Sequence, residues 1–197
     1  MKNIIFTLSV LLLLSSCSTS VKRIESGTQG DLSGNWNAKD VQIVCEALIA
    51  DCLSSARVDQ EIRARKNKPV VIVGRFKNES GEQIDTAIIT AIMETVIFNS
   101  GKMDFVAAGD TRADIRAERQ EQQGNASEET TAALGKEIGA NYMLTGSVRI
   151  IVDREENKSV RTYFVSAELT NIETNARIWL GHNNEITKVV IRPKNKL

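Results

Sequence analysis

A strand–helix–strand pattern in the first half of the chain constrains the fold more than any other sequence feature. The run Val70–Phe76 is almost continuously apolar and β-branched, which predicts a buried central strand. Asp85 has the chemistry of an N-cap for a helix over Thr86–Asn99, and Gly101 is placed to end that helix. Residues 104–108 predict a second, short strand. Together the three elements indicate a parallel, right-handed βαβ unit.

Another helix is predicted before this unit. Asn37 suits its N-cap and Asp40 its first turn, and we expect the helix to run to Leu53. Its apolar positions share one face: Val41, Val44, Cys45, Leu48 and Cys52. Cys45 and Cys52 would lie about 10.5 Å apart along the helix, beyond the roughly 7 Å limit for a disulfide. We therefore expect two small buried side chains, whereas a disulfide would require the helix to break between them.

The C-terminal part predicts antiparallel strands. Residues Tyr142–Val152 and Val160–Thr170 predict two strands joined by a charged hairpin loop, Asp153–Lys158. The second strand places four apolar side chains on one face: Tyr163, Val165, Ala167 and Leu169. The segment Ala176–Val190 completes the meander, and we expect three of its side chains to face inward: Ile178, Leu180 and Ile186.

Between the two regions, Thr111–Gln123 predicts a strongly polar helix, and a further helix is predicted to start at Ser127. The sequence as a whole therefore predicts the α/β (α+β) class. We expect a single domain with a mixed, mainly antiparallel twisted sheet flanked by helices.

The first seventeen residues have the three-part layout of a secretory signal. Lys2 supplies a positive end, Ile4–Leu14 is apolar apart from Thr7 and Ser9, and small residues lead to Cys17. An apolar run of this length is too short for a bilayer core, which needs about 20 helical residues. The ending Leu-Ser-Ser-Cys resembles the lipobox of bacterial lipoproteins. That resemblance implies cleavage before Cys17 and acylation of its thiol and new amino group, and Ser18 in place of Asp favours the outer membrane.

The expected organisation is a signal peptide over 1–16 and a lipidated Cys17 with a flexible tether over 17–34. A globular domain over 35–191 and a polar tail over 192–197 follow. The tether spans at most roughly 60 Å and averages about 25 Å as a coil. Trp36 is expected to pack back onto the domain.

The sequence shows no catalytic constellation. Lys and Arg total 25 and Asp and Glu total 25, a balance that argues against nucleic-acid binding. His182 is the only histidine, and its neighbours Asn183 and Asn184 predict an exposed turn or bulge. Two cysteines and one distant histidine do not make a metal site. We therefore expect no enzyme activity, metal, cofactor or small-molecule substrate.

Several segments resemble the LpoB-type activators of penicillin-binding proteins. They are Pro69–Ser80, Asp31–Asn37, the run from Glu168 to Trp179 and above all Leu134–Val148, with its Gly-Ala-Asn-Tyr-Met-Leu-Thr-Gly block. The resemblance covers about residues 31 to 190. Related blocks occur in curli-secretion lipoproteins and in the TolB amino-terminal domain, so a TolB-like fold is implied.

The resemblance implies an outer-membrane lipoprotein that binds a bifunctional penicillin-binding protein and stimulates peptidoglycan synthesis. An alternative is an oligomeric component of a secretion or envelope-assembly machine related to the curli exporter, which would form a ring. As partner-contacting residues we predict the face of the polar helix that carries Arg112, Arg116 and Arg119. A solvated helix face is the other explanation of these arginines.

Overall fold

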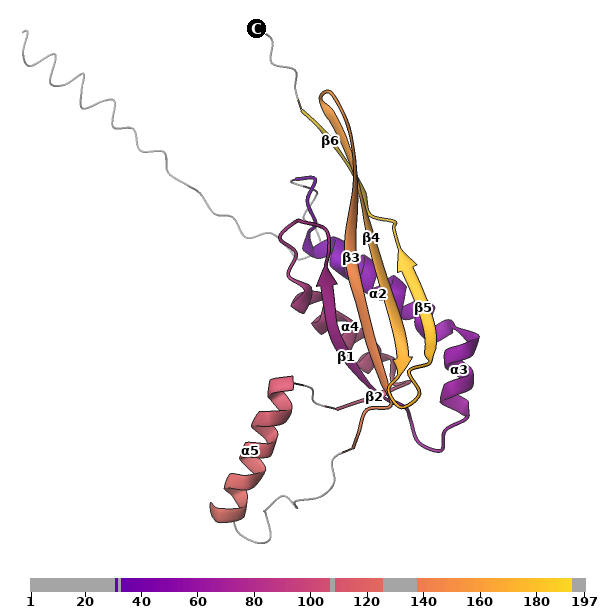
Figure 1. Ribbon diagram of the computed structural model, residues 1–197, viewed down its shortest axis with the longest axis vertical. Coiled ribbons are helices and arrows are strands. Elements are labelled where there is room, and N and C mark those ends of the chain that lie inside the picture. The colour runs from indigo at the N-terminus through magenta and orange to yellow at the C-terminus, as the bar shows by residue number, and fades with distance from the viewer. Residues whose placement is uncertain (1–30, 32, 107–108, 126–137, 193–197) are drawn as a thin grey trace, which may run out of the picture. The chain divides into compact units, whose positions relative to one another are not determined.

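The computed structural model describes residues 31, 33–106, 109–125 and 138–192. In chain order its elements are α2 (Ala38–Ser54), α3 (Ala56–Arg63), β1 (Val70–Asn78), α4 (Thr86–Ser100), β2 (Asp104–Phe105), α5 (Gly109–Asn125), β3 (Tyr142–Glu155), β4 (Lys158–Asn171), β5 (Arg177–Asn183) and β6 (Thr187–Ile191) (Figure 1). The signal peptide, Cys17 and the helix expected from Ser127 lie outside the described residues. No helix within the described ranges is long and apolar enough to span a bilayer.

The strands of the described residues form one mixed sheet in the order β2-β1-β3-β4-β5, and β6 also pairs with β4. Strand β1 pairs in parallel with both β2 and β3, whereas β4 pairs antiparallel with β3, β5 and β6. This topology confirms the predicted fold class and the parallel strand–helix–strand unit. Strand β2 is shorter than predicted and ends at Phe105.

Helix ends follow the local sequence signals. Asn37 caps α2 in a capping box with Asp40, and Asp85 caps α4 by accepting a hydrogen bond from the Ala87 N–H. Gly101 ends α4 in the left-handed conformation, with φ of 65°, which glycine adopts without strain.

Helices α2 and α4 cover one face of the sheet (Figure 1). Strand residues alternate between this face and the other one, so every second side chain of β4 enters the core. The four residues predicted to share that face, Tyr163, Val165, Ala167 and Leu169, are all buried. Trp36 packs on Tyr163 with ring centroids 5.1 Å apart, as expected.

Both central cysteines are free and buried, which confirms the prediction against a disulfide. They lie on the core side of α2. Burial, with a smaller contribution from the adjacent carboxylates of Glu46 and Asp51, raises the pKa of Cys45 and of Cys52 to about 12.

The prediction of a loop over Asp153–Lys158 is wrong. Strands β3 and β4 continue to the pair Glu155–Lys158, and only Glu156 and Asn157 form the turn. This end of the hairpin extends beyond Val148, the last residue of β3 that pairs with β1. Few side chains at this end of the hairpin are buried, so its strand residues are mostly polar. The sequence of this end therefore resembles that of a charged loop.

The inward orientation predicted for Leu180 is also wrong, since 66% of its surface is exposed. Leu169 pairs with Trp179 and Thr170 pairs with Arg177, so Ile178 is an extra residue in a β-bulge. The bulge puts both Ile178 and Trp179 in the core and turns Leu180 outward. Ile186 is partly buried against the core, as expected.

His182 is exposed, as predicted, but it lies within β5 rather than in a turn. Its ring stacks on Phe164, with centroids 5.2 Å apart and planes 14° from parallel.

Candidate functional site

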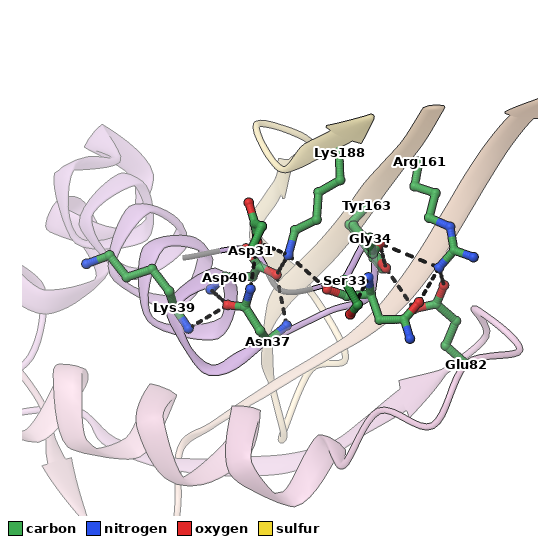
Figure 2. Close-up of polar contacts among 11 residues, drawn as sticks. Asp31, Ser33, Gly34, Asn37, Lys39, Asp40, Glu82, Arg161, Tyr163 and Lys188 are labelled. Carbon is green, nitrogen blue, oxygen red and sulfur yellow. Dashed lines mark hydrogen bonds and ion pairs between the residues drawn. The ribbon is translucent and has the colours of Figure 1, made fainter. Parts of the chain in front are cut away.

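The N-terminal end of the described chain is fixed to the sheet by a polar cluster, which Figure 2 shows. We call it the N-terminal clasp and define it as Asp31, Gly34, Asn35, Asp40, Glu82, Arg161, Tyr163 and Lys188. It joins the segment before α2, the first turn of α2, the loop after β1, and strands β4 and β6. The expected tether included residues 31–34, but Asp31 and Gly34 already bond to the folded domain.

Lys188 is the central cation of the clasp and only 6% of its surface is exposed. Its Nζ lies 2.6 Å from Asp40 Oδ2 and 2.7 Å from Asp31 Oδ1, and it donates to the Asn35 carbonyl at 2.8 Å. Burial lowers the pKa of Lys188, but hydrogen bonds and charge from Asp31 and Asp40 outweigh burial and raise it overall. Three oxygen partners therefore compensate the ammonium group for the water it has lost.

Glu82 organises the second half of the clasp. Its Oε2 lies 2.7 Å from the Tyr163 hydroxyl, and its Oε1 accepts a hydrogen bond from Arg161 Nη1 at 2.9 Å. The Gly34 carbonyl oxygen is 3.1 Å from the same hydroxyl, and Arg161 also donates to Asn35 Oδ1. Burial, together with the bond to Glu82, raises the pKa of Tyr163.

The clasp has the chemistry of an attachment, not of a reaction centre. Its cations face carboxylates at ion-pair distance, and its phenol faces a carboxylate that favours the neutral form. Neither a thiol nor a histidine belongs to it. The described residues also contain no group of three or more His, Cys, Asp and Glu that could hold a metal ion. What the arrangement does is fix where the chain enters the domain.

The face of the sheet opposite the helices is a second candidate site. We call it the open face and define it by the residues that line a cavity of about 380 Å³ on β1, β3, β4 and β5 and in the loop after β1: Arg75, Lys77, Glu79, Thr145, Gly146, Ser147, Arg149, Ser166, Ala167, Glu168 and Leu180. The Ser147 and Ser166 hydroxyls are 3.2 Å apart across two strands. Gly146 has its missing side chain toward the core, where Phe76 fills the space beneath it.

Charges on the open face are only partly paired. Arg149 forms an ion pair with Glu79 at 2.5 Å, and Glu168 pairs with Arg177 at 2.9 Å. Arg75 and Lys77 are exposed and form no ion pair with any other described residue. Leu180 is exposed on the same face, two strands further across the sheet, so the surface combines unpaired cations and an aliphatic side chain, a composition suited to protein contact.

The predicted contact residues Arg112, Arg116 and Arg119 lie on α5, where their spacing of four and three places them along one face. Arg116 is exposed and the other two are partly exposed, and none of the side chains described on α5 is buried. They do not line the open face, whose cationic residues had no local signal in the sequence. Cys17 lies outside the described residues.

Comparison with known proteins identifies one family. The family model described as "Peptidoglycan-synthase activator LpoB" matches residues 40–184, about three quarters of the chain. A search of curated proteins gives no match.

Several solved structures of low sequence identity also match the chain. The LpoB C-terminal domain from Escherichia coli is 18% identical, with a TM-score of 0.45, and the match covers 73% of this chain and 96% of that one. The same domain from Salmonella enterica is 17% identical, with a TM-score of 0.43 and coverage of 78% and 99%. Lipoprotein GNA1162 from Neisseria meningitidis is 16% identical, with a TM-score of 0.36 and coverage of 66% and 86%.

Proposed function

Because the chain belongs to the LpoB family of peptidoglycan-synthase activators, we propose that it activates its synthase by direct contact through the open face of the sheet. Family membership confirms the expectation of a non-enzymatic regulator that binds a penicillin-binding protein. It also favours this function over the alternative of a secretion component, which rested on a weaker resemblance.

The observation that carries the proposal is the asymmetry of the sheet. Helices α2 and α4 bury one face, and the other carries a hollow lined by Arg75, Lys77 and Leu180. Interfaces are enriched in arginine. The cations can steer an acidic partner by charge, and the exposed aliphatic side chain on the same face supplies apolar burial. A partner segment with carboxylates around an apolar side chain would complement this surface.

The clasp supports the same assignment, because it binds the segment before α2 away from the open face. Lys188, Arg161 and Tyr163 point toward the helix-covered side, and Gly34 is bonded to that side of the sheet. The described segment before α2 is therefore bound on the side opposite the proposed docking surface.

We further infer that the protein is an envelope lipoprotein acylated at Cys17 and held in the outer membrane. The lipobox-like ending and Ser18 support this assignment. Fourteen residue steps separate Cys17 from Asp31 (31 − 17), so the tether reaches at most about 50 Å and averages about 20 Å as a coil. A synthase partner must then extend toward the anchoring membrane.

The arginine face of α5 is a second candidate contact. Arg112, Arg116 and Arg119 lie on one side of a helix with no buried side chain among those described, so they serve little core. We propose the arginine face only as a contact additional to the open face. The stimulation assay described next distinguishes the two surfaces.

The test is stimulation of glycan polymerisation by a purified penicillin-binding protein from the same cell. We expect Arg75→Glu/Lys77→Glu to reduce stimulation at least tenfold without changing the unfolding midpoint. The matched control Arg57→Glu/Lys66→Glu reverses the same charge on exposed residues in and just after α3 and should stimulate normally. Full stimulation by the open-face variant, with loss in Arg112→Glu/Arg116→Glu/Arg119→Glu, would move the contact to α5.

A further inference from the structure

A second hollow lies at the turn end of the β3–β4 hairpin, away from the open face. We call it the hairpin pocket. It has a volume of about 270 Å³ and is lined by Arg154, Glu156, Asn157, Lys158, Ser159, Arg161, Val190 and Arg192. Four of its eight lining residues are cationic and one is acidic. Neither the family match nor the proposed docking surface accounts for this concentration of charge.

Three of the four cations are available to a ligand. Arg154, Lys158 and Arg192 are exposed, and their side chains form no ion pair with any other residue in the described ranges. Arg161 is already bound to Glu82 in the clasp, although its Nε is buried and has no hydrogen-bond partner. The pocket therefore holds an excess of positive charge that the residues in the described ranges do not neutralise.

The strand register explains why the three arginines converge. Arg154 pairs with Ser159 across the hairpin, and Ser159 pairs with Val190 on β6, so all three point to the same face. Arg192 follows Val190 by two residues and its backbone N–H donates to the Asn157 carbonyl at 2.7 Å. Arg161 follows Ser159 by two residues, so Arg154, Arg161 and Arg192 share this face. Lys158 pairs with Glu155 and Ile191 and belongs to the opposite face of the strands, although it also lines the pocket.

The donor set fits a phosphate group. A guanidinium offers two parallel N–H donors that match two oxygens of a phosphate, and a lysine adds a point charge. Asn157 and Ser159 supply further hydrogen-bond donors at the rim. Glu156 opposes this binding, which makes it a useful position for testing the sign of the effect.

The segment before α2 lies beside the hairpin pocket, and the proposed lipid anchor on this segment would bring membrane phosphate close to it. A Cβ on Gly34 would lie 2.1 Å from Val190 Cγ2, and the Gly34 carbonyl is 3.5 Å from Arg161 Nη1, so the chain enters the domain beside the pocket. If Cys17 is acylated as proposed, the headgroups of its membrane lie only a short tether away. Their effective concentration is then high, and weak affinity suffices for occupancy.

We propose that the hairpin pocket binds the phosphate of phospholipid headgroups in the anchoring membrane and so orients the domain on that surface. This inference rests on the proposed lipid anchor for its source of phosphate, but the pocket itself can be tested without the anchor. Binding orients the domain by its hairpin end and leaves the open face to the synthase.

The experiment uses the mature chain with Cys17→Ser, which lacks only the acyl groups. Inorganic phosphate is titrated while the backbone amide signals of Asn157 and Ser159 are followed by NMR. In parallel, flotation measures binding to vesicles of phosphatidylethanolamine with phosphatidylglycerol and to vesicles of phosphatidylcholine alone. Arg154→Gln/Arg192→Gln is compared with the matched control Arg57→Gln/Lys66→Gln.

We expect saturable shifts with phosphate and flotation with the anionic vesicles that weakens as salt is raised. Arg154→Gln/Arg192→Gln should reduce both affinities about tenfold, the control should not, and Glu156→Gln should raise them about threefold. Shifts with phosphate but no flotation would overturn the headgroup assignment, and no shifts would overturn the site. Neither result bears on synthase stimulation, which is measured separately with the open-face variants.

Discussion

Replacing Lys188 by Met removes the cation at the centre of the clasp while keeping a side chain of similar length. The ammonium group is buried and bonded to Asp40, Asp31 and the Asn35 carbonyl. Asp40 is itself buried, with 5% of its surface exposed, so the substitution leaves its carboxylate without a countercharge in the interior.

The size of the stability loss depends on the hydrogen bond that Asp40 retains. Removing one partner of a buried ion pair costs about 3–5 kcal/mol. Asp40 retains the capping-box hydrogen bond from the Asn37 N–H at 2.9 Å, which compensates part of its charge. We therefore expect Lys188→Met to lower the free energy of unfolding by about 2–4 kcal/mol.

A double variant tests whether the unpaired carboxylate of Asp40 causes the loss. In Lys188→Met/Asp40→Asn the amide oxygen can still accept from Asn37, and no buried charge remains, so at least about 1 kcal/mol should be recovered. Asp31→Asn is the exposed control and should change stability little. Urea unfolding at pH 7 measures the free energy of unfolding of the parent chain and of the three variants. We expect the m-value to be the same in all four. A loss below about 1 kcal/mol for Lys188→Met, or no recovery in the double variant, would show that this ion pair does not stabilise the fold.

Three further predictions concern the rest of the fold. The folded thiols of Cys45 and Cys52 have pKa values of about 12 against an ordinary value of 9.0, so the unfolded chain loses its protons first and stability falls as pH rises above 9. At pH 10 the loss in free energy of unfolding is about 1.4 kcal/mol per thiol. Between pH 8 and 10.5 the free energy of unfolding, measured with urea, should therefore fall less steeply with pH in Cys45→Ala/Cys52→Ala than in the unsubstituted chain. Gly146→Ala should cost about 1–3 kcal/mol, since the new Cβ would lie 2.3 Å from the Phe76 ring, and a thermal-unfolding midpoint within 1 °C of the parent would contradict this. Asp85→Ala removes the N-cap of α4 and should cost about 0.5–2 kcal/mol in urea unfolding, whereas Asp85→Asn should retain most of the stability.

The elements that the sequence predicted correctly are those set by neighbouring residues. The Asn37 cap, the Asp85 cap and the Gly101 terminus depend on side chains within a few positions of each other. The alternation in β4 likewise depends on a pattern of period two, so its buried face could be named in advance.

The clasp could not be predicted from local patterns. Lys188 and Asp40 are 148 positions apart, and their contact exists only because β6 pairs with β4 beside the start of α2. A lysine between threonine and valine in a strand indicates an edge or an exposed face, so its burial depends on partners that the sequence does not place.

Leu180 shows a different limit. A strict alternation from Ile178 would turn Leu180 inward, and the single extra residue of the bulge reverses that orientation. Leu180 lines the open face only because of this bulge, so its place in the site could not be predicted from the alternation in the sequence. The predicted arginines of α5 depend on helical spacing alone and still require a functional test.

Photocrosslinking in living cells shows whether the synthase contacts the open face. A photoreactive residue is placed at Leu180 on the open face and, in a second chain, at exposed Gln42 on the helix-covered side. We expect a covalent product with the peptidoglycan synthase from position 180 and none from position 42. A product from position 42 alone, or no synthase product from either position, would contradict it.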